Sequence, residues 1–311
     1  MVKALPNTEF HQLVPLLRDK EFYEAEPQRP IDWPAYTQAQ IYDVKKALQF
    51  IREKVDETNC LPMPGKTGRP LTDPKILAKA ILLAELLGSP ERPSQGWSSI
   101  LGPAVGIYYE LDDRVIGEAY NNIEVLYILK QVFDENKTSD GKLSGDGTHW
   151  EMSRKHNYES TKKQYGVELT SIVDTREVVQ SFSTNENEVR AMHELIKRVE
   201  GNSLRLDAGF NGRDLVDAID ELGLKPFIFP KKNNLINGHL AWKLMYWELY
   251  LDVMTWLTEY HQRSHTESFH SSIKRRNPLV RKRRPTAQLS QITARIILHN
   301  RRRIDYFDQQ I

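Results

Sequence analysis

The sequence predicts an α/β protein in which an all-helical N-terminal region precedes a mixed five-stranded sheet with flanking helices. Throughout the N-terminal region, apolar residues recur at helical spacing, as they do in residues 41–51. After the polar segment 134–142, the expected order is strand, strand, strand, helix, strand, helix, strand, helix. That order is typical of an α/β layer. We therefore expect two domains, 1–137 and 138–311.

The clearest helix of the N-terminal region begins at Asp73. This residue is a suitable N-cap, Pro74 fits the first helical position, and Gly88 follows the apolar run. Helices are also expected at 41–55 and 112–133, where apolar residues keep helical spacing.

The C-terminal region contains the predicted sheet. Residues 165–174 alternate in the manner of a half-buried strand, and 177–183 follow across a short polar turn as its hairpin partner. The other expected elements are a strand around Asp146, a helix at 187–201, a strand at 203–210, a helix at 211–223 and a strand at 225–230. A long helical region follows, and we expect its tryptophans to lie in the core, because tryptophan is usually highly buried. They are Trp242, Trp247 and Trp256.

Composition limits the class of protein. Of the 311 residues, 40% are hydrophobic and 27% are charged, which suits a soluble protein with a real core. The one cysteine, Cys60, excludes an internal disulfide. The first residues lack the apolar segment of a signal peptide. The most apolar run, 76–88, is interrupted by Lys79 and Glu85 and is too short to span a bilayer. We therefore expect a soluble intracellular protein.

Positive charge is concentrated near the C-terminus, although the net charge of the chain is only +1. From Tyr260 onward there are twelve Lys and Arg residues against three Asp and Glu, and residues 273–285 hold seven of these cations. A solvated face or a flexible tail is the usual explanation of such a run. The apolar residues that flank it favour folded structure and a polyanionic partner, most simply nucleic acid.

A group of polar residues immediately precedes this basic run. If 260–274 is one helix, then Tyr260, Arg263, Glu267 and Lys274 fall within roughly 60° on the helical wheel, with Phe269 and Ile273 on the opposite side. An amphipathic helix with an exposed salt bridge explains the same spacing, since Arg263 and Glu267 stand at i,i+4. The rest of the chain has to distinguish the two interpretations.

Three carboxylates fall where an α/β sheet forms binding sites, at or near the carboxyl ends of strands. Asp146 lies on the first expected strand, Asp207 ends the fourth, and Glu267 lies on the closing helix. Gly145 and Gly147 flank Asp146 and would allow a ligand to approach the backbone. Taken singly, Asp146 is also explained as a polar strand end, and Asp207 as a residue of a helix-entry turn.

Together these residues resemble a known family. The four-residue group fits the signature Y-x2-R-x3-E-x6-K without a gap, and the contexts GDGTHW and LRLDAGF surround the other two acids. The sequence thus resembles the DDE transposases of prokaryotic insertion sequences, in the branch marked by that signature (the insertion-sequence-four-like superfamily). The resemblance extends from Gly68 to Arg303. It implies that 138–311 form an RNase H-like catalytic domain with basic C-terminal helices.

The resemblance also implies a reaction. The chain would be a DNA transposase that cleaves transposon ends and transfers the strands into target DNA, of the cut-and-paste type. Asp146, Asp207 and Glu267 would hold two Mg²⁺ ions, for which Mn²⁺ can substitute, because hard carboxylate oxygens suit these ions. The metal ions would activate water or a DNA 3′-OH, so that no protein nucleophile is needed.

The DNA contacts follow from the same comparison. Tyr260, Arg263 and Lys274 would orient the phosphate of the strand that is not transferred. Lys231 and Lys232, after the last strand, would track the backbone, with loop solvation as the alternative. The basic run would neutralise phosphates through Arg275, Arg276, Arg281, Lys282, Arg283 and Arg284. The partners would be double-stranded DNA, as terminal inverted repeats and target, and a second subunit in a synaptic homodimer. Residues 1–137 would bind DNA ends or dimerise, and the protein would be cytoplasmic and associated with the nucleoid.

The sequence departs from the family pattern in two places. Some relatives carry a β insertion between the second acid and the glutamate, and here that interval is short and helical, so the base-capturing aromatic of that insertion cannot be carried over. One of Trp242, Trp247 and Trp256 is the alternative for that role. Val167 and Glu168 follow Gly166 where relatives have a lysine, so the DNA contact of that lysine is not carried over to this chain. Two other functions stay open: a catalytically silent DNA-binding protein derived from a transposon, and a structure-specific nuclease of the same fold.

Overall fold

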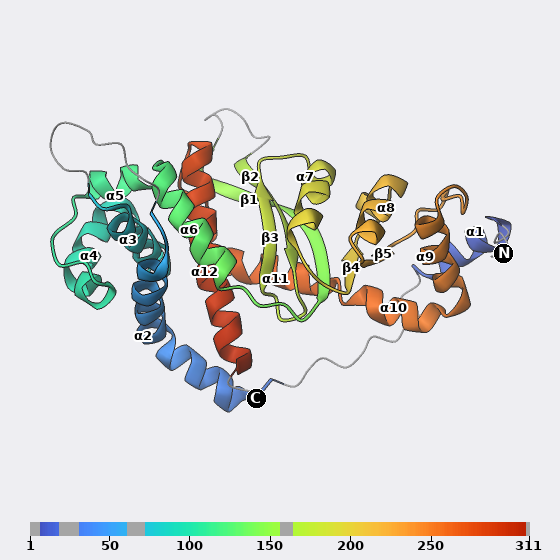
Figure 1. The fold of residues 1–311 in the computed structure, drawn as a ribbon, viewed down its shortest axis with the longest axis horizontal. Coiled ribbons are helices and arrows are strands. Elements are labelled where there is room, and N and C mark those ends of the chain that lie inside the picture. The colour runs from blue at the N-terminus through green and yellow to red at the C-terminus, as the bar shows by residue number, and fades with distance from the viewer. Residues whose placement is uncertain (1–6, 19–30, 61–71, 156–163, 309–311) are drawn as a thin grey trace. The chain divides into compact units, whose positions relative to one another are not determined.

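The computed structural model describes residues 7–18, 31–60, 72–155 and 164–308 (Figure 1). A five-stranded mixed sheet with flanking helices confirms the expected RNase H-like α/β fold class. The strands are β1 Lys142–Lys155, β2 Gln164–Val173, β3 Val179–Thr184, β4 Ser203–Leu206 and β5 Lys225–Ile228. The helices before the sheet are α1 Asn7–Leu16, α2 Trp33–Glu57, α3 Pro74–Leu86, α4 Glu91–Val105, α5 Asp113–Ala119 and α6 Ile123–Glu135. The later ones are α7 Glu188–Leu195, α8 Arg213–Glu221, α9 Leu240–Leu251, α10 Val253–His261, α11 Ser264–Arg276 and α12 Pro285–Asp308, with short 3₁₀ turns η1 Ile196–Arg198 and η2 Ala208–Phe210.

The order of the strands across the sheet is β3-β2-β1-β4-β5. β2 and β3 form the predicted antiparallel pair, whereas β1 pairs with β4 and β4 with β5 in parallel. Parallel neighbours end at the same edge of a sheet, so β5 ends level with β4, and the residue after β4 lies beside the part of the longer strand β1 that follows Gly145.

The chain forms two compact units that interleave along the sequence. The sheet unit takes the described residues of 1–31, 139–148 and 168–270, and the helical unit takes those of 32–138, 149–167 and 271–311. The division of the chain into domains at about residue 137 stays a prediction.

An aromatic core holds the sheet unit together. Trp242 and Trp256 are each 3% exposed, and Trp247 packs partly buried against the same core, so the predicted packing role of the tryptophans is confirmed. Helix α1 adds Phe10, whose ring centroid lies 5.1 Å from that of Tyr246. This N-terminal helix therefore packs into the core of the sheet unit.

The helical unit is built around α3 and α12. The predicted ends of α3 are confirmed, because the Asp73 carboxylate accepts a hydrogen bond from the Lys75 N–H (2.8 Å), Pro74 begins the helix and Gly88 has a φ of 61°. Helix α12 packs along α2, α3 and α6, as Figure 1 shows for the red helix beside the green one. Two charged residues of α3, Lys79 and Glu85, are buried.

The helix expected over 260–274 is instead two helices. Helix α10 ends at His261 and α11 begins at Ser264. Between them the Arg263 N–H donates to the Tyr260 carbonyl (3.0 Å) and the Thr266 N–H to the Arg263 carbonyl (3.1 Å). These i to i−3 bonds close a tighter turn than an α-helix and interrupt the helix. Along the described residues, no helix combines the length and apolar character that crossing a membrane requires.

Candidate active site

The pairing of β1 with β4 brings two of the predicted acids together. Gly145 is the register partner of Leu206, so the next residues along the two parallel strands are Asp146 and Asp207. Asp207 turns its carboxylate back to accept a hydrogen bond from the Gly209 N–H at the start of η2. Both acids therefore stand at one edge of the sheet, as the sequence predicts.

Hydrogen bonds to the sheet place the third acid. One residue before Glu267, the buried Thr266 hydroxyl donates to the Ser144 hydroxyl on β1 (2.7 Å). One turn later, His270 shares a hydrogen bond with Ser171 on β2 (2.9 Å between Nε2 and Oγ). The first half of α11 is thus fixed against the strand that carries Asp146, with Phe269 completely buried beneath it.

Helix α10 is fixed to β4 by a buried arginine. Arg205 is 1% exposed, and its Nε donates to the Glu259 carbonyl (2.7 Å) while its guanidinium pairs with the Glu259 carboxylate. The next residue, Tyr260, is 8% exposed and stacks on Trp256, with 5.3 Å between ring centroids. Burial raises the pKa of Tyr260 to about 12, so the side chain acts as a neutral hydroxyl at physiological pH.

Arg263 links two of the acids. Its guanidinium donates to Asp146 Oδ2 at 3.0 Å and to Glu267 Oε1 at 2.5 Å, from the turn between α10 and α11. The Arg263 and Asp146 side chains are 20% and 19% exposed, against 56% for Glu267. The i,i+4 pair predicted for an exposed helix is therefore present, but the same arginine also makes a half-buried contact with a different element.

Negative charge accumulates around Asp146. Burial raises the pKa of this carboxyl, and the nearby charges of Asp207 and Glu267 add to the rise, whereas Arg263 and the Gly147 N–H oppose it. The pKa of Arg263 itself is raised, because its anionic surroundings outweigh the opposing effect of burial. The site thus holds carboxylates close enough to repel one another, which is the condition that a bound cation relieves.

A fourth carboxylate stands beside these acids. Glu188, at the start of α7, accepts a hydrogen bond from the Gly147 N–H, which also donates to Asp146 Oδ1 (2.9 Å). Partial burial raises the pKa of Glu188, and the charges of Asp146 and Asp207 raise it further. A side chain at Gly147 would collide with the Glu188 carboxylate. The Glu188 carboxylate thus occupies the space beside Gly147, where the sequence predicts that a ligand could approach the backbone.

Sequence reasoning missed Glu188. It lies in the polar stretch STNENEVR, in which four acidic or amide residues have equal claims, and no spacing motif marks one of them. The signal is three-dimensional: Asn187 caps α7 by accepting from the Arg190 N–H (3.3 Å), and the Glu188 carboxylate accepts from the Gly147 N–H of β1.

The chemistry of the donor set suits hard divalent cations. Asp146, Asp207, Glu267 and Glu188 offer only oxygen donors, as Mg²⁺ and Mn²⁺ prefer, and their mutual repulsion favours a cation. Among the described residues, no three His, Cys, Asp or Glu side chains are arranged to coordinate one ion. Instead the guanidinium of Arg263 provides the positive charge between Asp146 and Glu267, bonded to one oxygen of each carboxylate.

The predicted DNA contacts differ in their surroundings. Lys231 and Lys232 are exposed on the loop after β5, at the sheet edge where Asp207 follows β4. In the helical unit, Lys274 donates to the His149 carbonyl (2.7 Å), and Arg275 and Arg283 are exposed.

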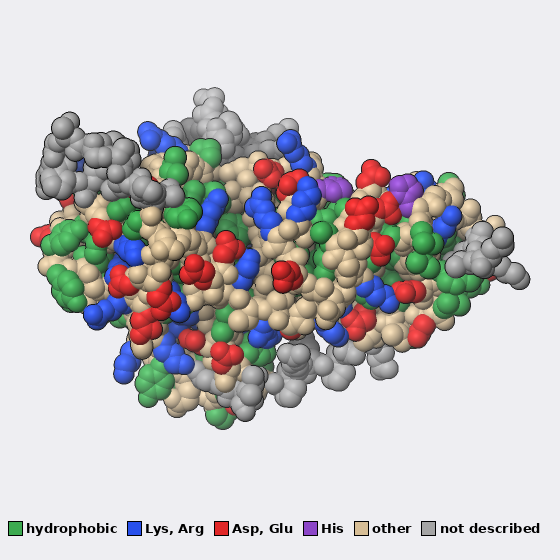
Figure 2. Space-filling view, in the orientation of Figure 1, with side chains coloured by type: hydrophobic (Ala, Val, Ile, Leu, Met, Phe, Trp, Pro, Cys, Tyr) green, Lys and Arg blue, Asp and Glu red, His purple; other side chains and the backbone are tan. Residues whose placement is uncertain are grey.

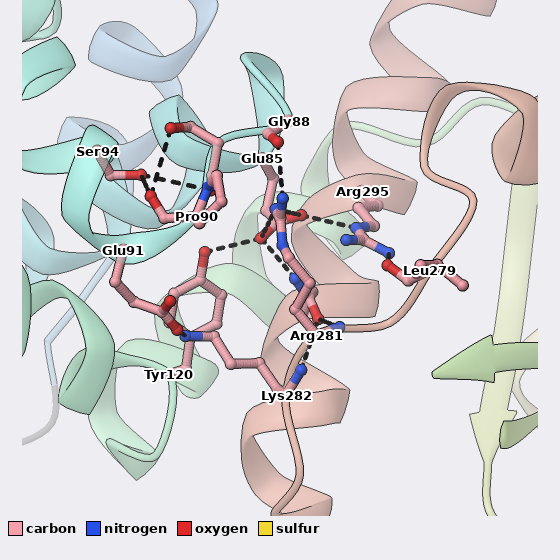
Figure 3. Close-up of polar contacts among 12 residues, drawn as sticks. Glu85, Gly88, Pro90, Glu91, Ser94, Tyr120, Leu279, Arg281, Lys282 and Arg295 are labelled. Atoms are coloured by element: carbon pink, nitrogen blue, oxygen red, sulfur yellow. Dashed lines mark hydrogen bonds and ion pairs between the residues drawn. The ribbon is translucent and has the colours of Figure 1, made fainter. Parts of the chain in front are cut away.

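Two cations of the basic run are engaged inside the protein. Arg281 contacts the fully buried Glu85 (3.2 Å), and Lys282 pairs with Glu91 and lies over the Tyr120 ring (Figure 3). Protein carboxylates already neutralise both charges, which argues against their expected role as phosphate ligands.

The remaining surface charge is mixed. Figure 2 shows acidic and basic side chains interspersed over the face in view, in keeping with the net charge of +1. Local groups of cations, rather than the overall charge, therefore favour a nucleic-acid partner.

Comparison with protein families gives one match, to a family described as "Transposase DDE domain", over residues 138–301, more than half of the chain. The matched region runs from the segment before β1 into α12 and includes Asp146, Asp207 and Glu267. Comparisons with curated proteins and with solved structures give no significant match.

Proposed function

Because the chain belongs to the family of transposases with a DDE domain, we propose that it cuts DNA at the ends of a transposable element and joins the freed ends to target DNA. This is the cut-and-paste form of transposition. The observation that supports it most strongly is the grouping of carboxylates from β1, β4 and α11 around one edge of the sheet.

In this proposal Asp146, Asp207 and Glu267 are the catalytic acids and hold two divalent cations, Mg²⁺ or, in its place, Mn²⁺. The ions, when bound, activate the attacking oxygen and stabilise the leaving oxygen of the phosphodiester. The protein contributes the position and ionisation of the three carboxylates. The pairing of β1 with β4 and the Thr266–Ser144 bond support that positioning role.

Arg263 has two proposed roles, one before and one during the reaction. Its bonds to Asp146 and Glu267 hold the like-charged acids in place. The planar fork of the guanidinium also suits a DNA phosphate, so we propose that Arg263 would donate to one during the reaction. We propose that Tyr260 and Lys274, from the same sequence signature, orient the phosphate of the strand that is not transferred.

The remaining DNA contacts are proposed on exposure and charge. Lys231 and Lys232 would follow the backbone near the active edge, and Arg275, Arg276 and Arg283 would neutralise further phosphates. Residues 1–137 are proposed to bind the element end or to form the synaptic homodimer.

A strand-transfer assay separates this proposal from a silent DNA-binding protein and from a nuclease. The terminal inverted repeats are first identified in the DNA that flanks the gene, and a labelled duplex ending in one repeat is incubated with the protein, Mg²⁺ and a target plasmid. A transposase joins the label to the plasmid. A nuclease releases cut ends that are never joined, and a silent protein binds the duplex without cutting it. Either of the last two results contradicts the proposal.

A further inference from the structure

The helical unit contains an arginine-lined pocket of about 180 Å³ between the C-terminal ends of α3 and α11 and the middle of α12. Its polar lining is Glu85, Arg276, Asn277, Arg295, His299 and Arg302. Since each water molecule occupies about 30 Å³ in the liquid, the pocket has room for a tetrahedral phosphate group.

Five arginines in and beside this pocket pair with three carboxylates. Glu85 contacts Arg295 (2.6 Å) and Arg281 (3.2 Å). Asp43 of α2 pairs with three more, which are Arg301, Arg302 (3.0 Å) and Arg276 (3.8 Å). One further acid, Asp305, contacts Arg301 (2.7 Å). The cluster therefore keeps an excess of positive charge, and buried like charges favour an anion.

The one carboxylate in the pocket wall does not cancel this excess. Figure 3 shows Glu85 held between Arg281 and Arg295, with the Tyr120 hydroxyl donating to it (2.8 Å). Gln291 donates to it as well (2.8 Å). Both oxygens of this buried carboxylate thus accept hydrogen bonds from protein donors, and its charge is already paired with two guanidinium groups.

Arg276 and Arg302 are the guanidinium groups that an entering anion would meet. The Arg302 side chain is 17% exposed, and its Nε donates to the two Asp43 carboxylate oxygens at 3.0 and 3.1 Å. These bonds do not use the terminal nitrogens of the guanidinium. Arg276 is 40% exposed, and its contacts with Gln40 (3.5 Å) and Asp43 (3.8 Å) are long. Burial lowers the pKa of Arg302 to about 10, and the charges of Arg276 and Arg301 contribute to the fall although Asp43 opposes it.

We propose that this pocket binds one phosphate group of duplex DNA, through the terminal N–H groups of Arg276 and Arg302. Guanidinium groups form paired hydrogen bonds with phosphate oxygens, and an anion here would restore the charge balance of the cluster. The DNA source rests on the proposed function of the chain, because a transposase must hold duplex DNA outside the cleavage site; a free phosphate ion has the same chemistry.

The test is the salt dependence of duplex binding, measured by fluorescence anisotropy with EDTA present so that no cleavage occurs. The proteins are wild type, Arg276→Gln, Arg302→Gln, the double variant, and Arg92→Gln as a control for the loss of one charge. Arg92 lies in the same unit with its side chain 93% exposed and its nearest carboxylate at 3.9 Å. Thermal unfolding with and without inorganic phosphate is measured for each protein.

If the phosphate is held by both arginines together, each single variant should make the negative slope of log K against log salt shallower by about 0.9, and the double variant by no more than that. Arg92→Gln should leave the slope unchanged. Inorganic phosphate should raise the unfolding temperature of wild type but not of the double variant.

Three results would overturn the assignment. The first is an unchanged slope of log K against log salt in both folded single variants. The second is a slope shallower by about two in the double variant. The third is a phosphate-induced rise in unfolding temperature with no change in DNA binding. If Arg302→Gln fails to fold, Arg276→Gln decides alone, since its contacts are long and exposed. The binding assay contains EDTA and does not depend on cleavage by the three acids. The proposed transposase activity and the proposed phosphate pocket can therefore fail separately.

Discussion

The contact between Arg263 and Asp146 makes a quantitative prediction. Exposed ion pairs contribute about 0.2–1 kcal/mol to stability, whereas hydrogen bonds to charged groups with limited solvent access contribute about 1.5–3 kcal/mol. With both side chains about one-fifth exposed and 3.0 Å between the bonded atoms, the pair falls between these classes. We therefore expect a coupling energy of about 1–2 kcal/mol.

The measurement is a double-mutant cycle with Arg263→Ala, Asp146→Asn and the combined variant, by urea unfolding at pH 7 in EDTA. Asparagine keeps the shape of Asp146 and removes its charge, so the cycle isolates the ion pair from packing. The control is the cycle for Lys225 and Glu248, a pair at 2.8 Å in the same unit with side chains 52% and 47% exposed. It should give at most a few tenths of a kcal/mol.

A coupling energy for Arg263 and Asp146 as small as that of the control would refute the reasoning. The turn between α10 and α11 would then be a solvated, salt-bridged surface, and Arg263 would not position the acids. A coupling near 1–2 kcal/mol would establish that the arginine of the signature organises the site before any DNA is present.

Three further predictions concern single residues. Glu188→Gln should fold normally but weaken Mn²⁺ binding roughly tenfold in calorimetry, because residues that support metal ligands typically contribute this much; unchanged binding would remove Glu188 from the site. Glu85→Gln should lower the free energy of unfolding by about 3–5 kcal/mol at pH 7. Salt bridges to Arg295 and Arg281 lower the pKa of Glu85 despite its burial, so this stabilisation exists above the unfolded pKa of about 4.3 and disappears as pH falls through the lower folded value. Urea unfolding should therefore show that the difference in unfolding free energy between wild type and Glu85→Gln is smaller at acid pH than at pH 7. A difference that does not change with pH would contradict the lowered pKa of Glu85. Arg283→Gln should make the negative slope of log K for DNA binding against log salt shallower by about 0.9. Arg281→Gln should reduce stability and leave this slope nearly unchanged. Equal slopes for the two variants would show that exposure does not select the DNA contacts.

Local patterns were sufficient to predict much of this fold. The ends of α3 follow from side chains that act on their own backbone, as Asp73 and Pro74 do. The parallel edge that joins Asp146 to Asp207 follows from the order of strands and helices, because consecutive elements of this kind pair in few ways. The family resemblance carried the assignment of the third acid, Glu267.

Other features depend on contacts that no local pattern contains. Helix α1 belongs to the sheet unit because Phe10 fits against Tyr246, and nothing near Phe10 in the sequence indicates that partner. The break between α10 and α11 has no glycine or proline to mark it. Arg281 looked like any other cation of the basic run, and only the position of Glu85, almost two hundred residues earlier, shows that its charge is already paired.

The three acids carry the proposed chemistry, and a comparison of two aspartate variants tests them directly. A duplex labelled at the element end is incubated with Mg²⁺ and either Asp207→Asn or the control Asp214→Asn, an exposed acid in the first turn of α8. We expect Asp207→Asn to bind the duplex normally and to nick it about a thousandfold more slowly than wild type, since a metal ligand supplies several kcal/mol of transition-state stabilisation. Asp214→Asn should nick at the wild-type rate. Nicking by Asp207→Asn at the rate of the control would contradict the assignment of the active site.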